Sequence, residues 1–274
     1  KTTLIRSLGQ ALDLKTSRIQ FTPDLMPADI VGTNVLIQDE ENRRIVRFQP
    51  GPVFAHIVLA DEINRATPKT QSALLEAMEE RTVTVSGTTH VLEEPFLVLA
   101  TQNPIEMEGT YPLPEAQVDR FMLKVNVEAP TLEELTRITT LNTEGRGIQL
   151  PAPAATRDQV LLARDAVRSI PVAQGLREYV ARLILATHPD SELAPAMVKS
   201  YVEYGASPRA AIALVMAAKA HAFLAGEIHV RQADIETAFR HALLHRLILN
   251  FKGDAEGVSA STILDEVWRK VALV

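Results

Sequence analysis

Short apolar runs that alternate with helical patterns restrict the fold of this chain more than any other feature. Continuous runs of about five residues are typical of strands that are buried on both faces of a sheet. Strands in alternation with helices predict a parallel α/β sheet in the first half of the sequence. The predicted strands are residues 18–21, 56–60, 95–100 and 121–125.

A helix and two hairpins are expected around these strands. A Thr-Pro start signal opens a helix that is predicted over 67–80. Residues 34–48 have apolar ends around a charged centre, and residues 81–91 alternate on both sides of a Ser-Gly pair. Both patterns predict β-hairpins, which we expect to project from the sheet.

The second half of the 274-residue chain has a different pattern. From about Thr131 the β signal fades, and Ala, Leu and Arg recur at helical spacing. A Pro/Ala-rich stretch at 151–155 resembles a linker, so we expect an α/β domain over 1–150 and an all-α domain over 151–274. The helices of the second domain are predicted at 156–169, 173–187, 194–203, 208–225, 231–248 and 260–272.

Composition excludes several classes of protein. The absence of cysteine excludes a disulfide framework, a thiolate zinc site and a cysteine nucleophile, and it permits an intracellular, reducing compartment. Charges interrupt every apolar stretch before it reaches membrane-spanning length. The net charge is -6, with the acidic excess in the first half. Nucleic acid is therefore disfavoured as a partner, although a local basic loop would escape this test.

Two groups of residues point to phosphate chemistry. Lys1, Thr2 and Thr3 open a helix as the end of a phosphate-binding loop does, where the lysine reaches the β- and γ-phosphates and the hydroxyl binds Mg²⁺. Asp61 and Glu62 end an apolar strand, where one carboxylate can hold hydrated Mg²⁺ while its neighbour polarises a water. An ordinary helix start and a solvated strand end are the alternative readings.

Asn103 and Arg120 are further candidates. Asn103 follows the apolar run at 95–100, and its carboxamide reaches the same edge if that strand lies beside the strand of Asp61. There it could position the attacking water or the γ-phosphate; otherwise it is a turn residue before a proline. Arg120 lies at a predicted helix-to-strand junction, where a plain surface arginine is the alternative.

Arg209 is unusual for its position. Ser207 is a predicted N-cap and Pro208 the first helical residue, so Arg209 places a cation at the positive end of a helix dipole. This costs a few tenths to ~1 kcal/mol unless an anion lies nearby. A phosphate contact would remove that cost, and an arginine that extends into solvent is the alternative.

Taken in order, these motifs resemble those of AAA+ ATPases, and specifically those of the MoxR family. The resemblance covers the chain from Lys1 to the last helices. Six segments carry it: Lys1-Thr2 (end of Walker A), 21–32, 59–66 (LADEINRA, Walker B), 100–104 (ATQNP, sensor 1), 113–121 (LPEAQVDRF, with the arginine finger) and 207–209 (SPR, sensor 2).

The resemblance implies an AAA+ core with inserted β-hairpins, followed by a helical lid, that binds ATP and Mg²⁺ between two subunits. Thr2 and Asp61 are expected to hold Mg²⁺. The residues expected at the nucleotide are Lys1, Thr2, Thr3, Asp61 and Arg209, and those expected to act in hydrolysis are Glu62, Asn103, Arg209 and, from the neighbouring subunit, Arg120. A finger arginine contributes about 10³–10⁵ in rate.

The family also implies a function and partners. ATP hydrolysis is expected to drive chaperone-like remodelling or maturation of protein complexes. A cytoplasmic homo-oligomeric ring, commonly of six subunits, is expected to act on protein clients, often with a partner that carries a von Willebrand factor A domain. The two hairpins are assigned to the pore or substrate face as a hypothesis.

The sequence departs from the family pattern at its start. The first strand and the glycines of Walker A precede the lysine in the family, and they are absent from this sequence. The backbone cradle for the phosphates is therefore missing. We expect this polypeptide alone to bind nucleotide weakly and to hydrolyse little of it, and a truncated chain explains the gap better than a natural loss.

Other functions are compatible with the same motifs. A magnesium-chelatase-like subunit and a DNA-translocating ring are AAA+ alternatives, and DNA-stimulated, salt-sensitive hydrolysis would favour the latter. A non-catalytic scaffold would keep the fold and the interfaces without turnover. The retention of Asp61, Glu62 and Asn103 argues against a scaffold, whereas the missing glycines argue for one.

Overall fold

The computed structural model describes residues 2–38, 40, 42–102, 110–143, 150 and 152–271. Contacts divide the chain into two compact units. The first unit comprises Lys1–Leu113 and Ala129–Leu162, and the second comprises Pro114–Glu128 and Ala163–Val274. Residues 114–128 thus belong by contacts to the second unit, and the domain boundary after residue 150 stays a prediction.

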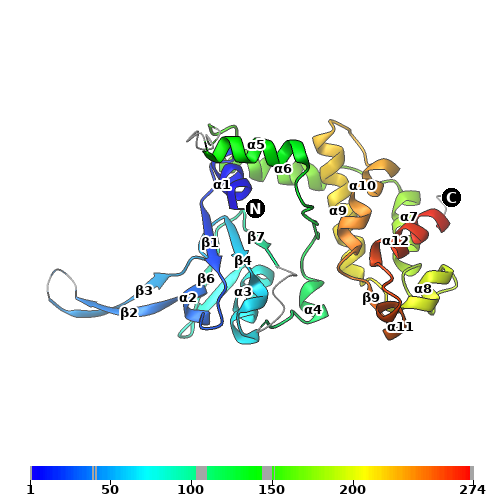
Figure 1. Ribbon diagram of the computed structural model, residues 1–274. Helices are drawn as coiled ribbons and strands as arrows, with labels where there is room; N and C mark the ends of the chain where they lie inside the picture. Colours follow the sequence, from blue (N-terminus) through cyan, green and yellow to red (C-terminus); the bar gives the residue numbers. More distant parts are fainter. Residues whose placement is uncertain are drawn as a thin grey trace. The chain divides into compact units, whose positions relative to one another are not determined.

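A three-stranded parallel sheet forms the centre of the first unit (Figure 1). Its strands, in spatial order, are β1 (Thr16–Gln20), β4 (Ile57–Asp61) and β7 (Leu97–Ala100). Three of the four predicted strands are therefore confirmed, and the continuous apolar run of β4 is buried as its pattern requires. Helix α1 (Thr2–Ala11) buries Ile5 in a cluster with Ile57 and Leu59 of the central strand.

Both predicted hairpins are present. The first pairs β2 (Gly32–Gln38) with β3 (Arg44–Pro50), and the second pairs β5 (Thr82–Val85) with β6 (Thr88–Val91). The β2–β3 ribbon extends away from the sheet, as Figure 1 shows, and exposes Leu36 and Val46. Gly32 has a φ of 93°, a backbone angle open to glycine, which lets the short helix α2 (Pro27–Val31) pass directly into β2.

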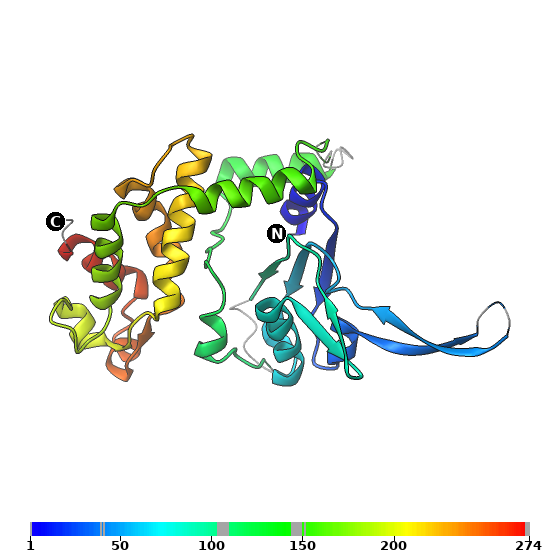
Figure 2. The same ribbon diagram turned by 180° about the vertical axis from the view of Figure 1, so that it is seen from behind.

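The remaining elements of the first unit are helical. A 3₁₀ turn, η1 (Ile63–Arg65), follows β4, and α3 (Pro68–Glu80) begins after the N-cap Thr67 as predicted. Helix α3 contacts β5 and lies beside the β5–β6 hairpin when the molecule is seen from behind (Figure 2). Helix α5 (Leu132–Thr143) belongs to this unit, and α6 (Arg157–Ser169) crosses from it into the second.

The second unit is built from helices around one apolar core. Trp268 lies in this core against Tyr179 and Phe239, with ring centroids 5.7 and 5.1 Å apart. Among the described residues, no helix is both long and apolar enough to cross a bilayer. The helices are α4 (Glu115–Val118), α7 (Gln174–Leu185), α8 (Ala196–Tyr201), α9 (Pro208–Leu224), α10 (Gln232–Leu243), α11 (Phe251–Ala255) and α12 (Ala260–Lys270).

Two expectations for this unit are wrong. Residues 121–125 form no strand, because their backbone groups bond to the C-terminal end of α10: the N–H of Lys124 donates to the carbonyl of His241 at 2.8 Å. The second half is also not entirely helical. The helices predicted over 194–203 and 231–248 end early, and β8 (Val202–Tyr204) pairs antiparallel with β9 (Ile248–Leu249).

Candidate functional site

The carboxyl edge of the parallel sheet gathers the polar residues that follow its strands. Gln20 lies opposite Asp61 in the register of β1 with β4, and Ala60 lies opposite Ala100 in the register of β4 with β7. Strands β4 and β7 are neighbours, so the run at 95–100 meets the condition of lying beside the strand of Asp61. Thr101 therefore leaves the sheet beside Asp61, at the edge where open α/β sheets bind ligands.

Both carboxylate oxygens of Asp61 accept hydrogen bonds. Arg18 donates to Oδ2 from Nη2 at 2.6 Å and from Nε at 3.1 Å. The hydroxyl of Thr101 donates to Oδ1 at 2.5 Å. The Asp61 side chain is only 18% exposed, against 50% for Arg18, so side chains from both neighbouring strands hold the acid in a shielded position.

Glu62 is positioned through its backbone and its side chain. Its φ of 57° lies in the left-handed region, where its N–H donates to the Thr101 hydroxyl at 2.9 Å. Its Oε2 accepts hydrogen bonds from Nε2 of Gln20 at 2.9 Å and from Nη1 of Arg65 at 3.0 Å. A strained backbone that surrounding groups over-determine is typical of functional sites.

The charges at this edge fit a divalent cation that also binds phosphate. Mg²⁺ usually binds proteins through one or two carboxylates, with substrate phosphates and waters as its other ligands. In the described part of the chain, no group of three or more His, Cys, Asp or Glu side chains could hold a metal by itself. Asp61 fits a site in which one carboxylate binds Mg²⁺ together with phosphates and waters. A cation bound there would displace Arg18 from Oδ2 of Asp61.

The structure describes only some of the remaining predicted site residues of the first unit. Thr2 and Thr3 form the start of α1, with Thr2 half-buried and Thr3 exposed. Lys1 and Asn103 lie outside the described residues. The structure therefore brings together Asp61, Glu62 and the start of the 101–103 segment, and the roles of the other residues stay predictions.

Arg209 lies where the sequence predicts it. Helix α9 begins at Pro208, and the hydroxyl of the N-cap Ser207 accepts the N–H of Arg209 at 3.2 Å. The chain itself supplies an anion here, because Oδ2 of Asp119 lies 3.5 Å from Nη1 of Arg209. The need for a compensating anion is met by a carboxylate, and a phosphate contact by this half-exposed side chain stays a prediction.

Asp119 is the centre of a polar cluster in the second unit. The Ser207 hydroxyl lies 2.9 Å from both its oxygens, and Nε of Arg246 donates to Oδ1 at 2.7 Å. Burial alone would raise the pKa of Asp119, but hydrogen bonds from Arg246 and Ser207, together with guanidinium charge, hold this pKa below its usual value. Arg120 follows in an exposed turn after α4, not at a helix-to-strand junction.

Three side chains at the sheet edge contact the two acids but were not predicted as site residues from the sequence motifs. Arg18 and Gln20 are two residues apart on β1, so they lie on one face of the strand and reach the two acids. Nη2 of Arg18 also donates to Oε1 of Gln20 at 2.5 Å. Thr101 is the first residue after the apolar run of β7, a position that faces the same edge.

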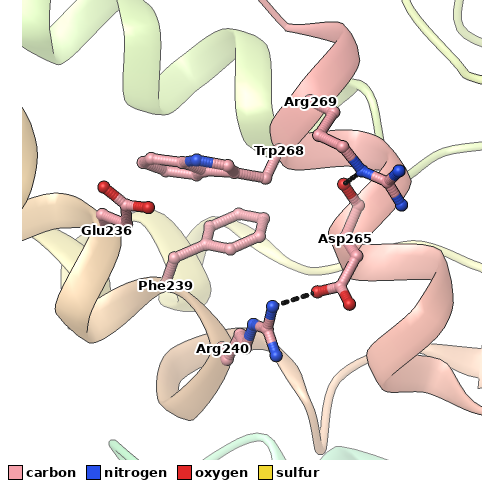
Figure 3. A pocket seen from close by; sticks show the side chains of 6 residues that line it. All are labelled: Glu236, Phe239, Arg240, Asp265, Trp268 and Arg269. Carbon is pink, nitrogen blue, oxygen red and sulfur yellow. Dashed lines mark hydrogen bonds and ion pairs between the residues drawn. The ribbon is translucent and has the colours of Figure 1, made fainter.

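A small pocket lies between α10 and α12 in the second unit (Figure 3). Its volume of about 200 Å³ is below the range of about 300–1,000 Å³ that is usual for ligand pockets. An ion pair of 2.5 Å between Arg240 and Asp265 forms part of its wall. None of the predicted site residues lines it: the lining residues are Glu236, Phe239, Arg240, Asp265, Trp268 and Arg269.

The fold and the sheet edge define an ATPase of the AAA class. Residues 1–123 match the ATPase family associated with various cellular activities (AAA), and residues 194–267 match the AAA lid domain. A crystal structure from Cytophaga hutchinsonii, provisionally described as an ATPase, superposes with a TM-score of 0.93 at 41% identity and covers 100% of this chain and 82% of the other.

The relatives narrow the class further. The chain is 40% identical to Chaperone MoxR1 of Mycobacterium tuberculosis, covering 100% of this chain and 71% of that protein. It is 39% identical to the uncharacterized protein YeaC of Bacillus subtilis, covering 99% and 81%. Protein MoxR of Paracoccus denitrificans is 30% identical over 91% and 77%. The chain belongs to the MoxR family of AAA+ ATPases.

Proposed function

We propose that this protein hydrolyses ATP at the carboxyl edge of β1, β4 and β7 and uses the reaction for chaperone-like remodelling or maturation of protein complexes. The observation that carries the proposal is the pair Asp61 and Glu62 at the end of a buried strand, with Thr101, the first residue after the neighbouring strand, bonded to both. The similarity to Chaperone MoxR1 supports the chaperone-like part.

Within one subunit, each residue has a distinct task. Bound Mg²⁺ would neutralise charge that develops on the phosphates. Asp61 and Thr2 hold the cation, while Lys1 and Thr3 contact the phosphates. Glu62 orients and polarises the attacking water.

Two further residues of the same subunit act on the reacting phosphate. Asn103 positions the attacking water or the γ-phosphate from the segment that follows β7. Arg209 binds the γ-phosphate in this proposal, and its ion pair with the Asp119 carboxylate is compatible with an anionic partner.

Glu62 must exchange partners for this task. Its Oε2 is engaged by Gln20 and Arg65 in the structure, so a water that it polarises has to compete with these two donors or use the other oxygen. A base of this type works only if it is within hydrogen-bond reach of the water. Gln20 and Arg65 therefore affect how readily Glu62 can act.

Arg120 completes the site of a neighbouring subunit in a homo-oligomeric ring, which we propose to be hexameric. Its exposed position in a turn is compatible with insertion into another copy. Since a finger arginine contributes about 10³–10⁵ in rate, hydrolysis depends on assembly. Size measurement by light scattering with and without ATP tests the ring.

We propose that the clients are proteins and that the ring acts on them in the cytoplasm. A protein with a von Willebrand factor A domain is proposed as a further partner. The β2–β3 ribbon is the proposed client-facing element, because Leu36 and Val46 pair on one of its faces and are 62% and 68% exposed. Apolar groups exposed on an extended ribbon are suited to contact unfolded or partly folded chains. The β5–β6 hairpin is assigned to the same face.

Glu62→Gln in the full-length protein tests the proposal. The variant keeps the size and one oxygen of the side chain but lacks the carboxylate, so it is expected to bind ATP without turnover. Arg120→Ala is expected to bind ATP and also to lose turnover. Glu76→Gln, the same substitution at an exposed position on α3, serves as the matched control with turnover retained.

A non-catalytic scaffold makes the opposite prediction. If the full-length protein assembles and binds its clients at the same rate with Glu62→Gln as without it, hydrolysis has no part in its function. Unchanged hydrolysis in both Glu62→Gln and Arg120→Ala would remove the site assignment.

A further inference from the structure

Arg246 is a buried arginine that none of the family motifs contains. It follows α10, and its side chain is 2% exposed. Every N–H group of its guanidinium is used, which is unusual because five donors must find acceptors in one plane. Nε donates to Oδ1 of Asp119 at 2.7 Å, and the other four N–H groups donate to main-chain carbonyls.

Three of those four carbonyls belong to one short segment. Nη2 donates to the carbonyls of Asp119 and Phe121, both at 2.8 Å, and Nη1 donates to the carbonyl of Met122 at 3.2 Å. The fourth bond, also from Nη1, returns to the carbonyl of Ala242 in the last turn of α10. A single side chain thus joins the end of α10 to residues 119–122.

Residues 119–122 have no regular structure to satisfy their carbonyls. Helix α4 ends at Val118, and the residues after it form neither helix nor strand. Arg246 provides hydrogen-bond partners for the carbonyls of Asp119, Phe121 and Met122. Nε2 of His245 adds one more contact, 2.9 Å from the carbonyl of Phe121.

We propose that Arg246 is a positioning residue for Arg120. Arg120 lies between Asp119 and Phe121, and Arg246 holds main-chain carbonyls on both sides of it. The backbone that carries Arg120 is therefore held by a side chain that follows the end of α10. The inference rests on the proposed function, in which Arg120 serves the site of a neighbouring subunit.

Only arginine can make these five hydrogen bonds from one side chain. Lysine keeps the positive charge for Asp119, but its three donors on a flexible stem cannot reach the same carbonyls in a plane. Catalytic groups need to be held within about 0.5 Å of their productive place, and a misplacement of about 1 Å can cost 10²-fold in rate. Arg246→Lys therefore keeps the positive charge but removes the planar set of donors that contact the main-chain carbonyls.

The first test is steady-state hydrolysis by the full-length protein. Arg246→Lys is expected to lower kcat about 100-fold. The KM for ATP is expected to stay unchanged, because the nucleotide-binding residues of the same subunit are intact. Arg240→Lys is the matched control, since Arg240 lies on α10 in a half-exposed ion pair with Asp265, and its kcat is expected to equal that of the unmodified protein.

Mixed rings distinguish a displaced finger from a damaged fold. Arg246→Lys subunits keep Glu62, and Glu62→Gln subunits keep the Arg246 contacts, so a mixture of the two is expected to regain hydrolysis. A mixture of Arg246→Lys with Arg120→Ala lacks a positioned finger in every subunit and is expected to stay inactive. If Arg120→Ala is rescued by Glu62→Gln subunits but Arg246→Lys is not, the inference is wrong.

A spin label reports the position without relying on activity. The sequence contains no cysteine, so Arg120→Cys offers a single labelling site within it. The nitroxide is expected to be more mobile when Arg246→Lys is added, with far-ultraviolet circular dichroism unchanged. Equal mobility in both backgrounds would overturn the inference, whereas full hydrolysis by Arg120→Ala with altered mobility would overturn only the proposed role of the finger.

Discussion

The hydroxyl of Thr101 lies 2.5 Å from Oδ1 of Asp61 and donates to it. The same hydroxyl accepts the N–H of Glu62 at 2.9 Å, and the carbonyl of Thr101 accepts the N–H of Ile63 at 3.1 Å. One residue after β7 thus fixes the carboxylate of the first acid and the backbone of the second. The two strands are coupled at the point where chemistry is proposed.

Replacing Thr101 by valine tests this coupling. The shape is kept, but the N–H of Glu62 loses its acceptor, which is expected to lower the free energy of unfolding by about 1–3 kcal/mol. The kcat for ATP is expected to fall, since both acids lose their orientation. Urea denaturation and steady-state kinetics measure the two effects. Thr101→Ser keeps the hydroxyl and should resemble the unmodified protein; equal losses in both variants would contradict the assignment.

Arg18 competes with a cation for Asp61. An ion pair with a half-exposed arginine is worth about 0–1 kcal/mol. Arg18→Gln is therefore expected to lower the Mg²⁺ concentration that half-saturates hydrolysis, by up to about fivefold. A magnesium titration of the ATPase rate measures it. Arg18→Lys keeps the positive charge and is the control, and a higher magnesium requirement in Arg18→Gln would speak against Asp61 as a ligand.

The pKa of His245 predicts how low pH affects the stability of the second unit. Burial, together with the charges of Arg246 and Lys124, lowers the pKa of His245 to about 4. Because the unfolded chain binds this proton near pH 6.5 and the folded chain does not, stability is lost as the pH falls from about 6.5 to about 4, by about 3 kcal/mol in total.

Denaturation of the unmodified protein and of His245→Gln between pH 7 and pH 4 measures this effect. Glutamine keeps a donor for the carbonyl of Phe121 but cannot be protonated, so its stability is expected to fall less steeply with pH. His229→Gln, at an exposed position, is the control and should follow the unmodified protein. Parallel curves for all three proteins would show that His245 is not the cause.

The role of the phosphate cradle in nucleotide binding can be tested by comparing chains of two lengths. A chain extended upstream by the first strand and the Walker A glycines is expected to bind ATP tightly, because its backbone N–H groups can surround the phosphates. The 274 residues alone are expected to bind it far more weakly and to hydrolyse little. Calorimetric titration of both chains measures this, and tight binding of equal strength would refute the role given to the cradle.

Much of the fold could be predicted because its signals are local. The apolar run of β4, the alternation on both sides of the β5–β6 turn and the Thr67-Pro68 start of α3 each depend on neighbouring residues. The strand predicted at 121–125 failed because its side chains are not buried. Met122 and Val125 are 43% and 67% exposed, and the backbone finds its partners on α10, far away in the sequence.

The site was predictable only where residues follow a strand directly. Asp61 and Glu62 end β4, and the parallel sheet brings them to its edge. Arg18 and Asp61 are 43 residues apart, and their contact depends on the register of two strands. The five bonds of Arg246 depend on a turn that no sequence pattern predicts. Long-range polar contacts of this kind become visible only in three dimensions.

The exposed ribbon of β2 and β3 has a consequence for solubility. Its two strands have open edges and apolar side chains, a combination that invites copies of the protein to stack into aggregates. Arg44 and Arg47 lie exposed along β3, where their positive charges are expected to oppose such stacking. We therefore expect these two cations to keep the apolar surface of the ribbon free for transient contacts, because like charges on identical ribbons repel each other.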